Sequence, residues 1–206
     1  MVPSSSKHWA DVYRGKSVDQ VSWFQPTATA SLEALARSGA SNTASLIDIG
    51  GGASTLVDDL QDLGWTDLSV MDLSAEALDV AKARLGDRAA RVSWTVGDVT
   101  TWRPQRTYDV WHDRAVFHFL EVVEARSAYK AAAQSALSHD GVLIIATFAP
   151  DGPTQCSGLP VVRYGVAELQ QEFGPQFVLI DSAQEDHRTP AGTVQPFTWA
   201  TFRRQR

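Results

Sequence analysis

The sequence has little cysteine and no long apolar run, and each absence excludes a class of protein. Cys156 is the one cysteine among 206 residues, which rules out an intrachain disulfide and a multi-cysteine metal cluster and favours a reducing compartment. No stretch approaches the roughly 20 apolar residues that cross a bilayer, and residues 1–7 lack the apolar core of a signal peptide. We therefore expect a cytoplasmic protein without a membrane partner.

Basic charge is also scarce. The chain has 18 Lys and Arg against 24 Asp and Glu, a net charge of −6 and an isoelectric point near 5.3. Because nucleic-acid binders usually carry a basic face, this balance argues against a nucleic-acid partner. The arginines at 203, 204 and 206 are expected to be a solvated end. The length and the 44% hydrophobic content fit one globular domain.

Short apolar runs alternate with helical patterns between about residue 45 and residue 148. Ser74 is a suitable N-cap for a helix whose apolar residues recur at helical spacing until Gly86, and another helix is predicted over about 122–137. Such alternation is typical of a parallel sheet with helices on both faces. The predicted strands in this region are 45–49, 67–71, 91–96, 108–112 and 141–148.

The two ends of the chain depart from this alternation. Up to about residue 42, aromatic residues interrupt a polar background, which predicts one or two helices ahead of the sheet. After a helix near 166–173, two strand-like runs at 176–184 and 196–203 follow without a helix between them. Because adjacent strands joined by a loop pair antiparallel, we expect the sheet to end in an antiparallel hairpin.

A glycine-rich turn lies between a short strand and a helix start. The chain from Leu46 to Thr55 is Leu-Ile-Asp-Ile-Gly-Gly-Gly-Ala-Ser-Thr. Glycine has no Cβ, so Gly50 and Gly52 allow backbone conformations and close approaches that other residues forbid. A turn of this kind after the first strand of an α/β sheet is where nucleotide-like cofactors bind.

Acidic residues discriminate between a dinucleotide and another adenosine cofactor. Asp72 ends the second predicted strand, where a carboxylate accepts hydrogen bonds from ribose hydroxyls. Asp98 follows the third strand, where it can receive the amine of an adenine. A dinucleotide site would have a glycine in place of Thr55, and Asp48 would repel a pyrophosphate but attract an ammonium group. These residues favour a cofactor with an ammonium group and no phosphate.

Three segments resemble the first three motifs of class I S-adenosylmethionine-dependent methyltransferases in order and spacing. They are Leu46-Ile-Asp-Ile-Gly-Gly-Gly, Val70-Met-Asp-Leu-Ser and Val96-Gly-Asp-Val. The resemblance covers nearly the whole chain and implies an α/β, Rossmann-like, doubly wound sheet of seven strands in the order 3-2-1-4-5-7-6. It also implies S-adenosylmethionine as cofactor and S-adenosylhomocysteine as product. Residues 1–42 would be a helical lid within the same domain as the methyltransferase part, 43–206.

The resemblance implies roles for the residues at matched positions. Gly50 and Gly52 would lie against the methionyl and adenosyl parts of the cofactor. Asp72 would bind the ribose and Asp98 the adenine, while Asp48 would face the methionine end. The predicted cofactor residues are Trp23, Asp48, Gly50, Gly52, Asp72, Leu73, Gly97, Asp98, Val99, Asp113 and Ala115. No metal site is predicted.

The segment 109–120 corresponds to the fourth strand and the following loop of that family, which borders the acceptor site. His118 is the candidate general base, because a base within hydrogen-bond reach can take a proton from the acceptor; a packing role is the alternative. His112 lies inside a strand and is expected to be structural. Arg14 is a candidate partner of the methionine carboxylate. The predicted substrate residues are Trp9, Tyr13, Arg114, His118, Cys156, Arg163 and His187.

Several functions stay open at this stage. A methyltransferase for a small-molecule acceptor is favoured by the aromatic N-terminal segment and the lack of an added recognition domain. Residues 21–25 and 156–164 resemble small bacterial methyltransferases of poorly defined substrate. A protein-lysine N-methyltransferase is the alternative, since an acidic surface could attract a basic protein. An NAD(P)-dependent oxidoreductase and an inactive scaffold are more remote, because Asp48, Thr55 and the cofactor acids oppose them. The sequence specifies neither the acceptor nor the oligomeric state.

Overall fold

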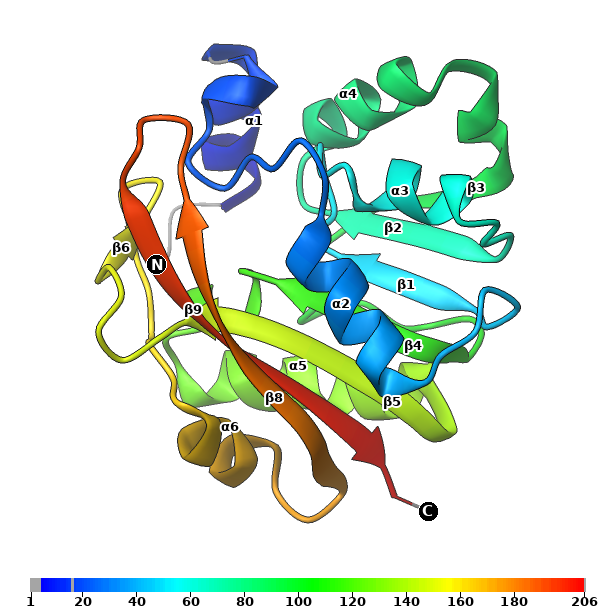
Figure 1. Ribbon diagram of the computed structural model, residues 1–206, viewed down its shortest axis with the longest axis vertical. Coiled ribbons are helices and arrows are strands. Elements are labelled where there is room, and N and C mark those ends of the chain that lie inside the picture. Colours follow the sequence, from blue (N-terminus) through cyan, green and yellow to red (C-terminus); the bar gives the residue numbers. More distant parts are fainter. Residues whose placement is uncertain (1–4, 16, 206) are drawn as a thin grey trace.

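A seven-stranded sheet organises the chain in this computed structural model, which describes residues 5–15 and 17–205 (Figure 1). Its strand order is β3-β2-β1-β4-β5-β9-β8, with parallel pairing from β3 to β5 and antiparallel pairing of β5 with β9 and of β9 with β8. The predicted order and the antiparallel end of the sheet are therefore confirmed. The strands are β1 Leu46–Ile49, β2 Leu68–Asp72, β3 Val92–Val96, β4 Tyr108–Arg114, β5 Leu137–Phe148, β8 Phe177–Arg188 and β9 Val194–Arg204; a separate hairpin joins β6 Gln155–Cys156 to β7 Leu159–Pro160.

Helices cover both faces of the sheet, as the alternating pattern predicted. One apolar core gathers residues of α2 to α4 on one face, and a second gathers residues of α5 and α6 on the other. Figure 1 shows α2 in front of the sheet and α5 behind it. The helices are α1 Ser5–Gly15, α2 Thr29–Ser38, α3 Leu56–Asp62, α4 Ala75–Leu85, α5 Val123–Ala136 and α6 Val166–Phe173, with 3₁₀ turns η1 Val18–Gln20, η2 Gly86–Arg91 and η3 Phe117–Phe119.

Local sequence signals explain several of these boundaries. Ser74 caps α4, because its Oγ accepts a hydrogen bond from the backbone N–H of Ala77 at 3.2 Å. Gly86 follows the last residue of α4 with a positive φ of 58°, which favours glycine. Strand β5 begins at Leu137, four residues earlier than the apolar run at 141–148 suggested, because α5 ends at Ala136 and the chain extends at once.

An aromatic segment before β1 closes over one edge of the sheet. We call residues 5–28, without the undescribed residue 16, the N-terminal cover. Helix α1 contacts α4, and the ring of Trp9 meets those of Trp23 and Phe119 at 5.5 and 5.3 Å between centroids. The turn between β8 and β9 lies beside α1 (Figure 1), and His187 donates from Nε2 to the carbonyl oxygen of Ser22 at 2.7 Å. The cover is thus attached both to α4 and to the terminal hairpin.

Among residues 5–15 and 17–205, every helix is too short or too polar to cross a bilayer.

Candidate active site

The glycine turn after β1 has no space for side chains. Gly50 and Gly52 have φ values of +67° and +35°. A Cβ on Gly50 would overlap Val116 Cγ2, and a Cβ on Gly52 would lie 2.6 Å from Asp72 Oδ2. Only glycine combines these backbone angles with such close neighbours. The turn therefore holds a cradle whose walls are the acid that ends β2 and the loop after β4.

The glycine turn packs on buried side chains that are linked to one another by hydrogen bonds. Asp48 is 4% exposed, and its Oδ1 lies 2.7 Å from His112 Nδ1. The other ring nitrogen of His112 lies 3.0 Å from Ser31 Oγ on α2. A Cβ on Gly51 would collide with Asp48 Oδ2, so the turn packs directly on this carboxylate. His112 fixes the orientation of Asp48 through this chain, and it also lines the cavity described below.

Asp72 lies at the carboxyl end of β2, and the pKa of its carboxyl group is higher than usual. The backbone N–H of Ser74 donates to its Oδ1 at 2.8 Å. Burial, with a contribution from the nearby charge of Asp48, raises the pKa of Asp72 to about 7. A buried carboxyl group at the rim of a cradle is a typical binding-site feature.

We predict that Asp72 makes stability and cofactor affinity respond oppositely to pH. Between its usual pKa of 3.8 and about 7, the folded protein binds more protons than the unfolded chain, so the free energy of unfolding falls as pH rises. Asp72→Asn should remove this loss, so its stability relative to the unmodified protein should rise between pH 5 and 8, by at most about 3 kcal/mol, because only the interval from pH 5 to the raised pKa of about 7 contributes in this range. Urea unfolding followed by tryptophan fluorescence measures it.

Affinity for S-adenosylhomocysteine should instead increase over the same pH range in the unmodified protein, because an ionised carboxylate accepts stronger hydrogen bonds. In Asp72→Asn it should be weak at both pH values. A stability difference that does not change between pH 5 and 8 would contradict the assigned titration.

The third acid of the predicted cofactor set follows β3. Asp98 Oδ1 accepts hydrogen bonds from the backbone N–H and the hydroxyl of Thr100, at 2.8 and 2.7 Å. Gly97 donates to the carbonyl oxygen of Asp72 at 2.9 Å, so β2 and β3 bring both acids to one edge of the sheet. Val99 is buried, and Leu73 is half-buried beside Asp72. These residues thus lie at the carboxyl ends of β2 and β3, and none of them lines the cavity described next.

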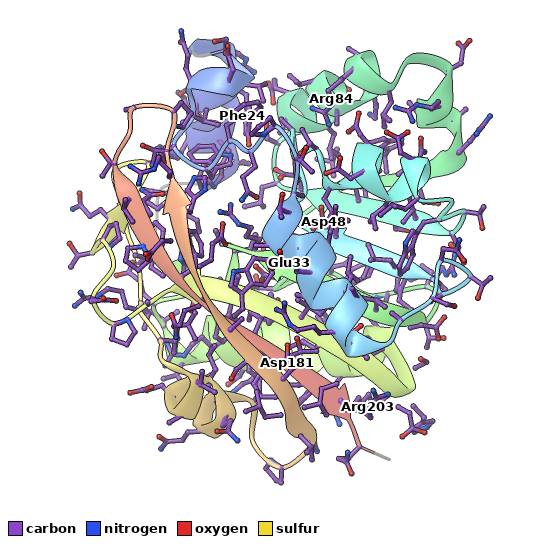
Figure 2. The ribbon with its side chains drawn as sticks, in the orientation of Figure 1. Phe24, Glu33, Asp48, Arg84, Asp181 and Arg203 are labelled. Carbon is purple, nitrogen blue, oxygen red and sulfur yellow. The ribbon has the colours of Figure 1, made fainter. Side chains whose placement is uncertain are left out.

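A cavity of about 50 Å³ lies between the glycine turn and the N-terminal cover. Figure 2 labels two of its residues, Asp48 and Phe24, between α1 and α2. Pockets that hold drug-sized ligands occupy about 300–1,000 Å³, so this cavity is smaller than an adenosyl cofactor needs. Residues of the cover that line the cavity are Tyr13, Val18, Val21, Trp23, Phe24 and Gln25; those of the remainder are Ser31, Asp48, Gly50, Gly51, Ala53, Ser54, Thr55, His112 and Arg114.

Arg114, at the end of β4, also lines the cavity, and its side chain extends along the sheet. Its guanidinium Cζ stacks 4.5 Å from the ring centroid of Phe197, and Nη2 donates to Glu185 Oε1 at 3.3 Å. Glu185 also accepts from Gln25 Nε2 at 3.0 Å and from Trp199 Nε1 at 2.8 Å. We call Arg114, Glu185, Gln25 and Trp199 the Arg114 cluster. It joins strands β4, β8 and β9 to the N-terminal cover.

His187 lies beside this cluster. The residue is 4% exposed, and because the carbonyl oxygen of Ser22 can only accept, Nε2 carries the proton. Nδ1 is therefore unprotonated and lies 3.9 Å from Glu185 Oε1. Burial and the charge of Arg114 lower the pKa of His187. The predicted substrate residue thus offers an acceptor nitrogen at the edge of the Arg114 cluster.

The predicted base, His118, requires correction. It is fully buried, its Nδ1 accepts the backbone N–H of Phe148 at 3.3 Å, and burial lowers its pKa to about 3. A ring this weakly basic has little tendency to take a proton at neutral pH. The structure supports the alternative of a packing residue.

The carboxylate of Asp113, a predicted cofactor residue, also points into the protein interior. Its carboxylate is fully buried and accepts bonds from Val116 N, Phe117 N and Tyr129 Oη, at 2.8, 3.1 and 2.5 Å. It therefore anchors the loop after β4. Its neighbour Ala115 has a φ of +73°, which is strained for a residue with a Cβ. The hydrogen bonds of Asp113 keep Ala115 in this strained conformation, where β4 reaches the cavity.

The remaining predicted substrate residues are divided between the cavity and its surroundings. Tyr13 lines the cavity, and its Oη accepts from Trp23 Nε1 at 3.3 Å; Trp9 packs behind Trp23. Cys156 is buried, and burial raises its thiol pKa to about 12, so a nucleophilic thiolate is disfavoured. Arg163 is exposed and donates to the carbonyl oxygen of Gly152 at 3.1 Å, outside the cavity lining.

Three site residues were missed from the sequence: Glu185, Gln25 and Trp199. Glu185 had a usable signal, because it lies two residues before His187 on a strand and so shares its face. Gln25 and Trp199 had none, since only the tertiary contacts bring them to Glu185. Arg14 does not line the cavity, but pairs with Glu76 of α4 at the surface.

Residues 46–141, which carry the glycine turn and all three acids, match the family described as "Methyltransferase domain". This part of the chain is a methyltransferase domain. The enzyme class and the resemblance predicted from the three motifs are thereby confirmed. No curated protein sequence matches the chain.

Solved structures share the methyltransferase fold over nearly the whole chain, with low sequence identity. One, described by "Conversion of a Disulfide Bond into a Thioacetal Group during Echinomycin Biosynthesis", is 21% identical with a TM-score of 0.76, covering 97% of this chain and 93% of its own. The N-methyltransferase NodS from Bradyrhizobium japonicum WM9, in complex with S-adenosylhomocysteine, is 15% identical with a TM-score of 0.72 and covers 98% and 99%. The 1,6-didemethyltoxoflavin-N1-methyltransferase of Burkholderia thailandensis is 20% identical with a TM-score of 0.70 and covers 98% and 85%.

Proposed function

We propose that the protein transfers a methyl group from S-adenosylmethionine to a small-molecule acceptor. The observation that carries this proposal is the glycine cradle of the methyltransferase domain, with Asp48, Asp72 and Asp98 at the carboxyl ends of β1 to β3. S-adenosylmethionine supplies, when bound, an electrophilic methyl group on a sulfonium. The cradle fits such a cofactor, since a Cβ on Gly52 would fill the space before the Asp72 carboxylate.

We assign the cofactor contacts as follows. Asp72 binds the ribose hydroxyls and Asp98 the adenine amine, while Asp48, oriented by His112, attracts the ammonium group. Trp23, which lines the cavity, lies over the reacting end. The other proposed cofactor residues are Gly50, Gly52, Leu73, Gly97, Val99 and Ala115.

The chain contributes to methyl transfer mainly through positioning and exclusion of water. The N-terminal cover encloses the cavity with aromatic rings, which attract cations at close range. His187, whose Nε2 donates to the carbonyl oxygen of Ser22, holds the N-terminal cover against β8. We propose that residues 1–42 act as a lid within the same domain as 43–206.

A small-molecule acceptor is favoured over a protein because the cover encloses the cavity, whereas a lysine on a protein needs an open groove. By their names, one structural neighbour acts on a small molecule, the 1,6-didemethyltoxoflavin-N1-methyltransferase, and another acts on a glycopeptide, the glycopeptide N-methyltransferase MtfA. An NAD(P) enzyme is disfavoured because Thr55, in place of the third glycine, donates its hydroxyl to the carbonyl oxygen of Gln25. The buried, protonated thiol of Cys156 suits a reducing compartment, and we propose the cytoplasm.

Calorimetry with S-adenosylhomocysteine and with NAD tests the cofactor. We expect heat of binding with S-adenosylhomocysteine alone; binding of NAD alone would refute the proposal. Incubation with a radiolabelled methyl donor and cell extract then tests the acceptor class. Label in the small-molecule fraction is expected, and label confined to the protein fraction would replace the small-molecule acceptor with a protein.

A further inference from the structure

The Arg114 cluster has more hydrogen-bond donors than acceptors. The guanidinium has five N–H groups, and its two hydrogen bonds within the described residues, to Glu185 Oε1 and to the carbonyl oxygen of Trp23, are long at 3.3 and 3.4 Å. Charge-assisted bonds of this type are normally about 2.7–2.9 Å. The side chain is 10% exposed, and its buried Nε has no hydrogen-bond partner in the described part of the chain.

Glu185 cannot remove this surplus. Its Oε1 already accepts from Gln25 as well as from Arg114, and its Oε2 accepts from Trp199 at 2.8 Å. The carboxylate is 14% exposed, so water has little access to it. A buried cation with long bonds and a counter-ion shared among three donors is incompletely compensated. A ligand that enters here lowers the free energy most if it brings acceptor oxygens.

The guanidinium lines the same cavity as Asp48 and Gly50 but extends away from them along the sheet. Asp48, His112 and Arg114 lie on one face of the sheet, by the pairing of Asp48 with His112 and the alternation along β4. The guanidinium stacks on Phe197 of β9, and β9 lies beyond β4 and β5 from β1 in the order β1-β4-β5-β9. A group bound at the guanidinium can therefore come from the acceptor or from the methionyl end of the cofactor.

We infer that Arg114 is a specificity-determining residue that binds a carboxylate of the methyl acceptor, so the acceptor is an anionic small molecule. The inference rests on the proposed function. A guanidinium and a carboxylate form two parallel N–H···O bonds, and Arg114 has unused N–H groups for them. The same carboxylate chemistry could come from the methionyl end of the cofactor, and the experiment must distinguish the two sources.

The test uses the full chain, with Arg114→Gln, Arg114→Lys and, as a matched control, Arg203→Gln. Arg203 lies on the same strand as Phe197 but at the opposite edge of the sheet, where it donates to the carbonyl oxygen of Asp140 (Figure 2). The first measurement is calorimetric affinity for S-adenosylhomocysteine. It should be unchanged within about twofold in all three variants, which also shows that they fold. Failure of the unmodified protein to bind would instead refute the proposed function.

The second measurement is label transfer to small molecules of a cell extract, separated by anion exchange and then cation exchange at pH 7 into anionic, neutral and cationic pools. We expect label in the anionic pool, and an acceptor KM about 10- to 100-fold higher in Arg114→Gln. Arg114→Lys keeps the positive charge but cannot form two parallel hydrogen bonds, so its acceptor KM should lie between those of the unmodified protein and Arg114→Gln. The acceptor KM of Arg203→Gln should match that of the unmodified protein.

Two results would overturn the inference while leaving the methyltransferase intact. Label in the neutral or cationic pool alone would exclude an anionic acceptor. A loss of S-adenosylhomocysteine affinity of tenfold or more in both Arg114 variants, each with an unchanged circular dichroism spectrum, would assign the carboxylate to the cofactor instead.

Discussion

Gly52→Ala is expected to weaken S-adenosylhomocysteine binding about 100-fold or more. The added Cβ would lie 2.6 Å from Asp72 Oδ2 and 3.2 Å from Ala77 Cβ, so the Asp72 carboxylate must leave its position and the methyl group fills the cradle. Loss of hydrogen bonds to a charged partner costs about 1.5–3 kcal/mol, and steric exclusion of the ligand adds to this. Calorimetry at pH 8, where Asp72 is ionised, measures the affinity.

Gly39→Ala is the matched control for backbone strain. Gly39 ends α2 with a φ of +79°, and a Cβ there would have no neighbour within 4 Å. This variant should lose about 1 kcal/mol of stability through the left-handed backbone and bind S-adenosylhomocysteine normally. If Gly52→Ala binds as well as Gly39→Ala, the cradle is not the cofactor site.

His112→Leu is expected to destabilise the protein by about 3–5 kcal/mol, the range found when one partner of a buried pair is removed. Asp48 is 4% exposed, and its carboxylate Oδ1 accepts a hydrogen bond from His112 Nδ1 at 2.7 Å. Without the imidazole, the carboxylate stays buried without this partner, and Ser31 loses its bond to Nε2. Urea unfolding measures the stability, and cofactor affinity should fall because Asp48 is no longer held in place.

A double variant separates the charge from the lost packing. Asp48→Asn with His112→Leu leaves no buried charge, so it should be more stable than His112→Leu alone although it carries one more substitution. Its affinity for S-adenosylhomocysteine should stay low, because the acid that attracts the ammonium group is absent. Additive losses of stability would contradict a coupled pair.

Most of the sheet could be predicted because each element carries a local signal. Ser74 and Gly86 mark the ends of α4, and β-branched runs mark the parallel strands. The predicted ends differ from the observed ones where tertiary pairing extends a strand. Strand β8, for example, continues to Arg188 because β9 supplies partners along its whole length.

In the candidate site, too, the residues with a local sequence signal could be predicted and the others could not. Asp72 and Asp98 could be placed because parallel strands end at one edge of the sheet, so their spacing in the sequence fixes their positions. His118 was assigned wrongly as a base because a residue's position in a loop says nothing about its burial. Glu185 was missed because its partners come from residues 25, 114 and 199, which are remote in the chain.

By itself, the sequence determined the methyltransferase domain and the expected cofactor edge, since the turn from Gly50 to Gly52 and the acids after β1 to β3 are local features of consecutive strands. Only the tertiary structure decided which polar groups are buried together. It paired Asp48 with His112 and placed Arg114 over Phe197 beside Glu185, whose carboxylate also accepts from Gln25 and Trp199. Burial and long-range contacts set the protonation and the unused hydrogen bonds of these groups, and they point to the acceptor.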